Sequence, residues 1–273
     1  MFSTPLRGVG VGLRREIADE LIASRRAIDW VEIIAENFMT LGGRARDRLL
    51  RARERWPVVP HGVALSLGSD EPAGYSEKVR ALADTIEAPL VSDHLCYSSL
   101  GGHEYLDLLP MPFCEEAARH MAERAAAHLA TVGRPFLVEN VTSYAIMPGT
   151  EMTESAFVRR FLELAGGGVG LLLDVNNLYL NAVNHGADPE ELLAAMPLDR
   201  VGQIHVAGHV AGDGVLLDTH SRPVAEPVWA LLRSALRQTG PVPILVEWDQ
   251  HITSVDALLD EADRARQILD EVS

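Results

Sequence analysis

VGLLLDVNN, at residues 169–177, is an apolar run that ends in an aspartate and two asparagines. Seven further runs are similarly short and rich in apolar residues, and a longer stretch with helical spacing separates most neighbours. They lie at 8–12, 30–38, 57–67, 89–97, 135–141, 201–209 and 243–250. Apolar strands that alternate with helices are typical of a parallel sheet covered on both faces. Eight such units predict an α/β fold, a single (β/α)8 or TIM barrel over residues 1–273.

Helical spacing is found between these runs. The predicted helices lie at 14–27, 44–54, 74–86, 113–131, 154–165, 189–195, 223–238 and 254–270. Asp188 and Ser254 are N-cap candidates for two of them. A doubly wound open sheet is the alternative arrangement of the same elements. The GVGVG run at 8–12 lacks the third glycine of the dinucleotide-binding pattern, so a nucleotide site of that kind is not expected.

The composition is that of a globular chain of 273 residues, with 47% apolar residues and a formal net charge of −15. That charge disfavours nucleic acid as a partner, because such binding draws on clustered Lys and Arg. The arginine-rich segment 44–56 contains acids and apolar residues at helical spacing, so we interpret it as a solvated helix face. No apolar run is long enough to span a membrane, and we expect a cytoplasmic protein. Cys96 and Cys114 are interpreted as ordinary buried thiols.

Six of the apolar runs end in or near a side chain that can bind a metal. These residues are His61, His94, Glu139, Asp174, His205 and Glu247. In a parallel barrel all of these ends lie at one rim, where active sites are built. Buried carboxylates at this rim are costly without a cation, and no lysine or arginine occupies these strand ends. The sequence therefore predicts a metal centre.

The segment 203–220 extends this set. Asp218 and His220 are spaced so that both side chains can point the same way, and we expect them to supply a further metal position. The eight donors exceed what one ion takes, so two or three ions fit better. Glu139 is expected to bridge two of them. Imidazole and carboxylate donors admit iron, manganese or zinc, so the reaction class stays open at this point.

Other polar side chains near these donors are expected to orient them or to take part in the reaction. His209 is a candidate ligand, supporting residue or proton donor, and we place it with Glu139 and Asp174 among the catalytic residues. Glu36 and Asn37 either face the substrate or close the barrel through hydrogen bonds. Candidates for orienting the ligands, with capping or turn formation as the alternative, are Asn140, Asn176, Asn177, Asp93 and Asp249.

Seven motifs resemble, in this order, those of the multinuclear non-haem iron-dependent oxidases, the family that includes the methanobactin biosynthesis oxidase. They are HGVALSLG, SDHLCY, VENVTSY, LLDVNNLYLNAVNHG, IHVAGH, DTH and VEWD, beginning at residues 61, 92, 138, 172, 204, 218 and 246. The resemblance covers nearly the whole chain. It implies a TIM barrel that holds two or three iron ions and uses O2 as co-substrate. It also implies cysteine residues of a small ribosomally made precursor peptide as the substrate, often with a small peptide-recognition partner protein.

The same resemblance implies how the ligands are shared. One iron would be held by His61, His94 and Glu139, its neighbour by Glu139, Asp174, His205 and Glu247, and the third by Asp218 and His220. More distantly, the ligand order resembles the xylose-isomerase-like TIM barrels, including the trinuclear zinc enzyme endonuclease IV. That family has a histidine where this chain has Asn177. An amide oxygen is a weaker donor than imidazole, so the third metal is expected to bind less tightly.

Alternatives to the iron oxidase remain open. One is a divalent-metal hydrolase or phosphodiesterase of the endonuclease IV type. Another is a sugar isomerase, although the strand ends offer no lysine near the metals. The last is a metal-free binding barrel, which predicts no bound metal and no loss of stability with a chelator.

Overall fold

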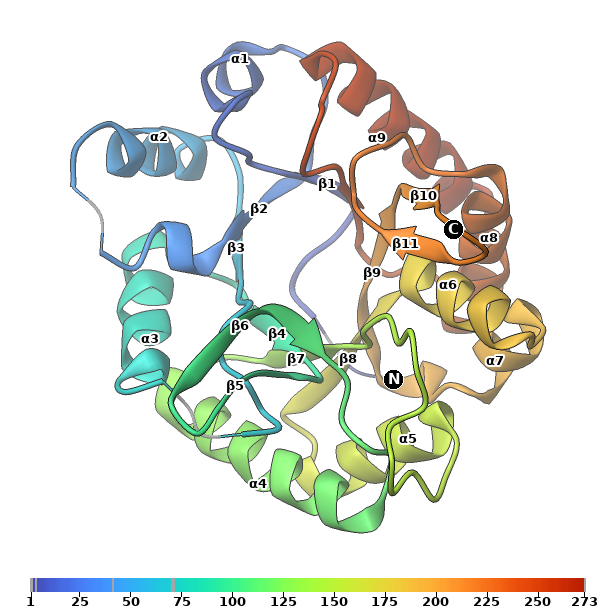
Figure 1. Cartoon of the computed structure of the whole chain (residues 1–273). Coiled ribbons are helices and arrows are strands. Elements are labelled where there is room, and N and C mark those ends of the chain that lie inside the picture. Colours follow the sequence, from blue (N-terminus) through green and yellow to red (C-terminus); the bar gives the residue numbers. More distant parts are fainter. Residues whose placement is uncertain (1, 3, 41, 70–71, 273) are drawn as a thin grey trace.

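The computed structural model describes residues 2, 4–40, 42–69 and 72–272, and these contain the expected closed barrel (Figure 1). Eight strands of this part of the chain pair in parallel in the closed order β1-β12-β9-β8-β7-β4-β3-β2. Their bounds are β1 Val9–Gly12, β2 Trp30–Ile34, β3 Val58–His61, β4 Val91–His94, β7 Phe136–Glu139, β8 Val169–Asp174, β9 Val201–Ala207 and β12 Ile244–Glu247. Closure excludes the doubly wound open sheet.

Helices surround the barrel (Figure 1). They are α1 Ala18–Ala23, α2 Gly43–Arg53, α3 Tyr75–Ile86, α4 Glu115–Val132, α5 Glu154–Ala165, α6 Val175–His185, α7 Pro189–Ala195, α8 Glu226–Thr239 and α9 Val255–Asp270, with short 3-10 helices η1 Ala35–Asn37 and η2 Leu198–Arg200. Both predicted N-caps are confirmed. Asp188 accepts hydrogen bonds from the backbone N–H groups that begin α7, and Ser254 does the same for α9. No helix in the described part of the chain has the length and apolar character needed to cross a membrane.

Most strands are shorter than the runs that predicted them, because other local structure begins at their ends. The prediction that the strand continues through residues 175–177 is wrong. Oδ1 of Asp174 accepts a hydrogen bond from the Asn177 N–H at 2.6 Å and so caps α6, a helix that the sequence analysis missed. The helix was missed because asparagine has a low helix propensity. The N-cap by Asp174 is the local feature that marks where the helix begins. Asp174 therefore ends a strand and begins a helix at the rim.

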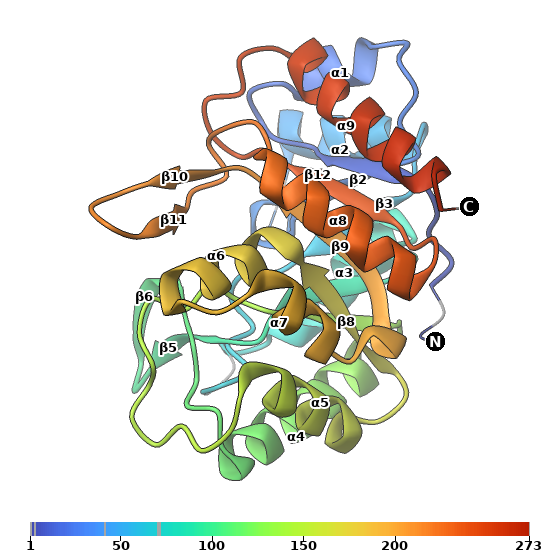
Figure 2. The ribbon, with the colours of Figure 1, turned by 90° about the vertical axis from the view of Figure 1, so that its right-hand side faces the viewer.

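Two antiparallel hairpins, also not predicted, extend from the carboxyl-end rim. In the first, β5 Tyr97–Leu100 pairs with β6 His103–Leu109, and in the second, β10 His209–Ala211 pairs with β11 Leu216–Asp218. Figure 2 shows the second hairpin projecting beyond the barrel on the side away from the chain termini. Its register sets His209 opposite Asp218. The hairpin thus brings two predicted site residues together.

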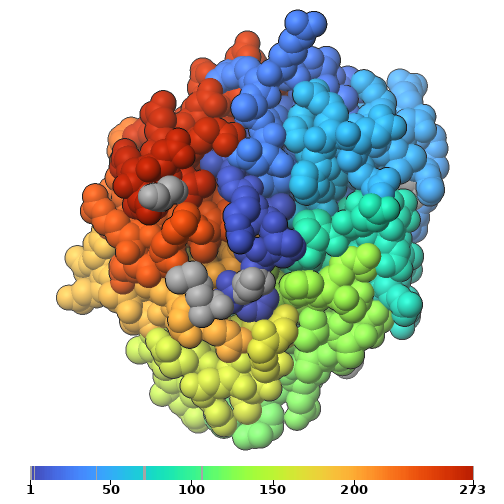
Figure 3. Space-filling model, turned by 180° about the vertical axis from the view of Figure 1, so that it is seen from behind, coloured from blue at the N-terminus to red at the C-terminus, as the bar shows by residue number. Residues whose placement is uncertain are grey.

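The amino end of the barrel interior is filled by apolar side chains. A buried cluster there contains Leu6, Trp30, Val59, Leu90, Leu137, Leu172 and Leu245, with Phe2 packed against it. Gly10 makes room for it, because a Cβ at this position would lie 2.4 Å from the Trp30 ring. Figure 3 shows this face, with the dark-blue N-terminal segment lying across its middle. Since this end is packed, polar side chains can be accommodated only toward the carboxyl ends of the strands.

Candidate metal centre

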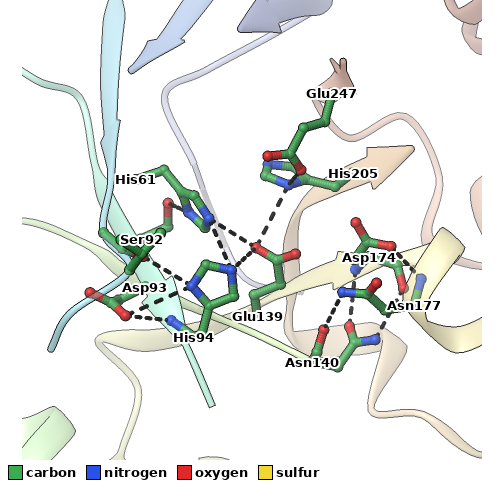
Figure 4. A network of polar contacts seen from close by, with 12 residues as sticks. His61, Ser92, Asp93, His94, Glu139, Asn140, Asp174, Asn177, His205 and Glu247 are labelled. Carbon is green, nitrogen blue, oxygen red and sulfur yellow. Dashed lines mark hydrogen bonds and ion pairs between the residues drawn. The ribbon is translucent and has the colours of Figure 1, made fainter. Parts of the chain in front are cut away.

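The six predicted donors of the strands converge at the carboxyl-end rim (Figure 4). His61, His94, Glu139, Asp174 and Glu247 are the last residues of β3, β4, β7, β8 and β12, and His205 lies near the end of β9. Each of the six is at most 6% exposed. Parallel strands in one barrel bring their carboxyl ends to the same rim, which accounts for the convergence of residues far apart in sequence.

The first group consists of His61, His94 and Glu139. Oε2 of Glu139 lies 3.3 Å from Nε2 of His61 and 3.5 Å from Nε2 of His94. The other ring nitrogens have partners of their own: His61 Nδ1 lies 2.8 Å from Ser92 Oγ, and His94 Nδ1 lies 3.0 Å from the Gly62 carbonyl oxygen. These contacts fix both rings so that their Nε2 atoms meet the carboxylate.

The second group consists of Glu139, Asp174, His205 and Glu247, whose donor atoms all lie within 4.8 Å of one another. His205 contributes Nδ1, which is 3.2 Å from Oε2 of Glu247 and 3.7 Å from Oε2 of Glu139. Glu139 is therefore common to the first and second groups. A carboxylate in this position is placed as a bridging ligand would be.

The third group differs from the one implied by the family resemblance. His220, Glu247 and Asp249 have donor atoms within 4.8 Å of one another. Asp218 lies beside this group, with Oδ1 at 2.8 Å from Nε2 of His220. Asp249, which the sequence analysis placed among the orienting residues, is thus a candidate donor, and Glu247 is shared with the second group.

The donor chemistry fits bound metal. Two atoms that bind one ion at about 2.0–2.2 Å lie within roughly 4.4 Å of each other, close to the 4.8 Å limit within which these donor atoms lie. Oε2 of Glu139 and Oδ2 of Asp174 are buried and have no hydrogen-bond partner among the described residues. Buried carboxylate oxygens are rarely left without a partner. Imidazole and carboxylate donors without thiolate suit iron, manganese or zinc.

The electrostatics of the site indicate a surplus of carboxylates. Burial raises the pKa of Glu139 to about 7, although His94 and His205 oppose the shift. Burial, together with Glu139, raises the pKa of Asp174 well above its ordinary range. Burial lowers the pKa of His94, but Glu139 and Asp93 outweigh it and raise that pKa to about 9. A cation among these groups would offset the repulsion that causes the shifts.

Three of the predicted orienting residues hold strand ends in place. Asn140 donates to the Asp174 carbonyl oxygen at 3.0 Å and accepts from its N–H at 2.9 Å. Asn177 donates to the carbonyl oxygen of Asn140 and accepts from the hydroxyl of Thr142. Asp93 accepts from the His94 N–H at 2.7 Å and from the Tyr75 hydroxyl at 3.0 Å. Asn177 thus uses its side chain to join loops of the rim.

The fourth, Asn176, connects the hairpin to the third group. Its Nδ2 donates to Oδ1 of Asp218 at 2.9 Å, and its Oδ1 lies 2.8 Å from Nδ1 of His209. His209 is half-buried and belongs to none of the donor groups of the described residues. Burial lowers the pKa of His209, although Asp218 opposes the shift. His209 lies beside the third group through Asn176, and its role stays a prediction.

Three buried charged or polar residues were missed. Glu32 and Gln203 are fully buried, and Gln203 donates to Oε2 of Glu32 at 3.1 Å. Arg14 follows β1 and is 6% exposed, and its guanidinium reaches Oδ1 of Asp249 at 2.5 Å and Oε1 of Glu247 at 3.2 Å. No lysine or arginine occupies the six strand ends, but Arg14 reaches Glu247 from the segment after β1. For Glu32 and Gln203 the sequence offered a signal, because each is a polar residue inside an apolar run, WVEII and VGQIHV respectively.

Glu36 and Asn37 belong to none of the three donor groups of the described residues. Oε1 of Glu36 accepts hydrogen bonds from the Val63 N–H at 2.8 Å and the Tyr75 hydroxyl at 2.5 Å, so Glu36 joins β2 to the segment after β3. Asn37 is exposed. Of the two predicted roles, the hydrogen bonds of Glu36 match the structural one, which closes the barrel.

The comparison with protein families covers nearly the entire barrel. A family model described as "RiPP precursor modification enzyme MbnB/TglH/ChrH" matches residues 8–270, where RiPP denotes a ribosomally synthesised and post-translationally modified peptide. The chain belongs to this family. It is therefore an enzyme of the MbnB/TglH/ChrH family, which acts on RiPP precursor peptides. The resemblance drawn from the sequence motifs is confirmed at the level of the family.

Bacterial relatives align with this chain over most of their length. A UPF0276 protein of Anaeromyxobacter sp. (strain Fw109-5) is 43% identical over 269 residues, which are 98% of this chain and 94% of the relative. A UPF0276 protein of Caulobacter vibrioides is 43% identical over 265 residues, or 96% of this chain and 94% of the relative. The similarity to these UPF0276 proteins thus extends over nearly whole chains rather than one motif.

Solved structures with the same architecture are xylose-isomerase-like barrels. D-psicose 3-epimerase from Clostridium cellulolyticum H10 aligns with a TM-score of 0.64 at 12% identity, covering 97% of this chain and 99% of that one. A xylose isomerase-like TIM barrel protein from Mycobacterium smegmatis, in complex with magnesium, aligns with a TM-score of 0.62 at 15% identity, covering 100% and 99%. At such low identity these neighbours confirm only the fold of this MbnB/TglH/ChrH family member. Its chemistry has to be inferred from the residues of the site.

Proposed function

We propose that this enzyme holds two or three iron ions and uses O2 to oxidise cysteine residues of a small RiPP precursor peptide. The observation that carries the proposal is the shared Glu139, whose Oε2 serves both the His61–His94 group and the group containing His205. A bridging carboxylate between two donor groups favours a multinuclear site over a single ion. The family supplies the peptide as substrate class.

The residues of the chain have separable tasks in this proposal. Bound iron would supply redox chemistry and a position at which a soft thiolate can bind. Ser92 and the Gly62 carbonyl group orient the two histidines of the first group. Arg14 offsets carboxylate charge on the third group. His209 lies in the hairpin, its Nδ1 at 2.8 Å from Oδ1 of Asn176, and in this proposal its ring takes up a proton released by the substrate.

The rim also offers apolar surface for a peptide or for a small peptide-recognition partner. Leu100 and Tyr105 of the first hairpin are 56% and 46% exposed, and Tyr144 and Ile146, in the connection after β7, are 52% and 76% exposed. The hydroxyl of Tyr144 accepts a hydrogen bond from the Asp218 N–H at 3.0 Å, so this connection borders the third group. Exposed apolar side chains beside a site are typical of a surface that binds protein or peptide.

The alternatives fit the same barrel less well. A sugar isomerase would be expected to use a lysine near the metals, and the sequence contains one lysine, Lys78, which is exposed on α3. A nuclease of the endonuclease IV type binds a polyanion, and a chain with a net charge of −15 repels one. A metal-free binding barrel leaves the buried carboxylates without compensation.

The experiment that tests the proposal is a reaction with candidate precursors. Small cysteine-containing peptides encoded beside the gene are incubated with anaerobically purified enzyme, and air is then admitted. We expect an O2-dependent change in peptide mass that maps to cysteine, and none with Glu139→Ala. Modification that proceeds equally under nitrogen, or at a residue other than cysteine, would contradict the proposal.

A further inference from the structure

A cavity of about 770 Å³ opens beside the metal centre, between the segment that follows β1 and helix α2. Arg14 and Asp249 both line the cavity. Asp249 also belongs to the third donor group, and Arg14 forms an ion pair with it. In Figure 1, α1 and α2 lie next to each other at the upper left of the barrel. Residues of both helices line the cavity. A molecule in the cavity would be separated from Glu247 by the guanidinium of Arg14, which contacts that carboxylate at 3.2 Å.

The cavity carries arginine in excess of carboxylate. Its lining includes Arg14, Arg15, Arg44 and Arg48, against Glu16 and Asp249. This is a local reversal in a chain whose net charge is −15. Its other walls are partly apolar, with Leu13, Ile34 and Phe38 among them. An arginine-rich hollow with apolar walls can take a short peptide segment that carries carboxylates.

Two of these arginines are compensated and two are not. Arg14 pairs with Asp249, and Arg48 pairs with Asp19 at 2.5 Å. Arg15 and Arg44 are exposed, and neither side chain has a hydrogen-bond or ion-pair partner in the described part of the chain. Nη1 of the buried Arg14 likewise has no partner among the described residues. The cavity therefore presents guanidinium groups whose donors are available to an incoming carboxylate.

We propose that this cavity binds an acidic segment of the precursor peptide, with Asp or Glu within a few residues of the cysteine that reaches the metal centre. The inference rests on the proposed function for the nature of the substrate. Peptide carboxylates that pair with Arg15 and Arg44 would fix the register of the peptide. One particular cysteine would then enter the mouth of the barrel. Bidentate pairing of arginine with carboxylate supplies both affinity and direction.

The test measures peptide binding to the as-purified enzyme under nitrogen by fluorescence anisotropy. The probe is a fluorescein-labelled, C-terminally amidated hexapeptide with one cysteine followed by Asp and Glu. A matched peptide has Asn and Gln in their place, and a third has Asn and Gln with a free C-terminal carboxylate. We expect the acidic peptide to bind about tenfold more tightly than the amide peptide. The third peptide distinguishes a terminal carboxylate from side-chain carboxylates as the source of the preference.

The variant carries Arg15→Gln with Arg44→Gln. The control carries Arg25→Gln with Arg237→Gln, two exposed arginines outside the cavity lining, and has the same net charge. The first pair should abolish the tenfold preference and the second should keep it. Equal affinity for the acidic and amide peptides, no measurable binding, or equal loss in both variants would overturn the proposal. Charge-selective binding of the probe, together with no O2-dependent change in the candidate precursor peptides, would instead contradict the proposed oxidation and leave the cavity assignment standing.

Discussion

Oε2 of Glu32 lies 3.3 Å from Nε2 of His205, and both side chains are fully buried. The other nitrogen of this ring, Nδ1, faces the carboxylate of Glu247 in the second donor group. Nε2 faces two groups, Oε2 of Glu32 at 3.3 Å and the side-chain nitrogen of Gln203 at 2.8 Å, and of these only the carboxylate can accept a proton. If Nδ1 binds a metal, the proton of the neutral ring sits on Nε2, where Glu32 is the acceptor. We therefore infer that Glu32 sets the tautomer and the orientation of His205.

Glu32→Gln should lower metal affinity at the second group by about tenfold or more, because a neutral acceptor holds the ring proton less strongly. Chelator competition followed by metal analysis measures the change. Glu36→Gln is the matched control, since Glu36 contacts Tyr75 and a backbone N–H rather than a donor histidine. Unchanged metal retention in Glu32→Gln would show that the contact does not support the ligand.

Glu139→Ala should lower the metal content at both the first and the second group, because the two groups share this carboxylate. Elemental analysis of anaerobically purified protein measures the content. Glu154→Gln, which alters a partly buried carboxyl group outside the donor groups, should retain the wild-type content. A Glu139→Ala protein with full metal and full turnover would remove the bridging role.

Asp218→Ala should mainly deplete one metal, the one associated with the third group, by removing the partner of His220 at 2.8 Å. The first and second groups keep their donors in this variant, so about two metals per chain should remain. Asp249→Ala tests the donor that the structure adds to this group. Wild-type metal content in both variants would exclude the hairpin side of the rim from the centre.

Glu154→Gln should stabilise the protein at alkaline pH. Burial raises the pKa of Glu154 to about 7, whereas Asn181 opposes the shift. The folded state then holds the proton more tightly than the unfolded state, so stability falls as pH rises from the ordinary glutamate range through 7. Gln cannot ionise, and the variant should gain about 3 kcal/mol at pH 8 relative to wild type and little at pH 4.

Thermal denaturation of both proteins at each pH measures this difference. A gain of about 3 kcal/mol corresponds to roughly 8 °C in Tm for a domain of this size. A gain that is the same at pH 4 and pH 8 would contradict ionisation of Glu154 as its cause.

The sequence was sufficient for the barrel and for the rim because both depend on local pattern and on a topological rule. Eight apolar runs gave eight parallel strands, and the ends of those strands carry the donors. The carboxyl ends of parallel strands meet whatever loops lie between them. His61 and Glu139 could thus be placed together from their positions in the runs alone.

The remaining features depend on long-range contacts that have no local signature. Arg14 reaches Asp249 across 235 positions of sequence, and Gln203 reaches Glu32 across 171. Helix α6 was missed because its asparagines have low helix propensity, whereas the cap by Asp174 and its buried face stabilise it. The two hairpins lie at the rim, where pairing depends on the loops around them.

The most direct measurement is elemental analysis of protein purified from its own host without oxygen, combined with Mössbauer spectroscopy of iron-enriched material. The proposed function predicts about two to three iron ions per chain, with magnetic coupling between ions that share Glu139. Stoichiometric zinc with negligible iron would contradict an iron-dependent oxidase. It would direct the search to hydrolytic chemistry at the same donors.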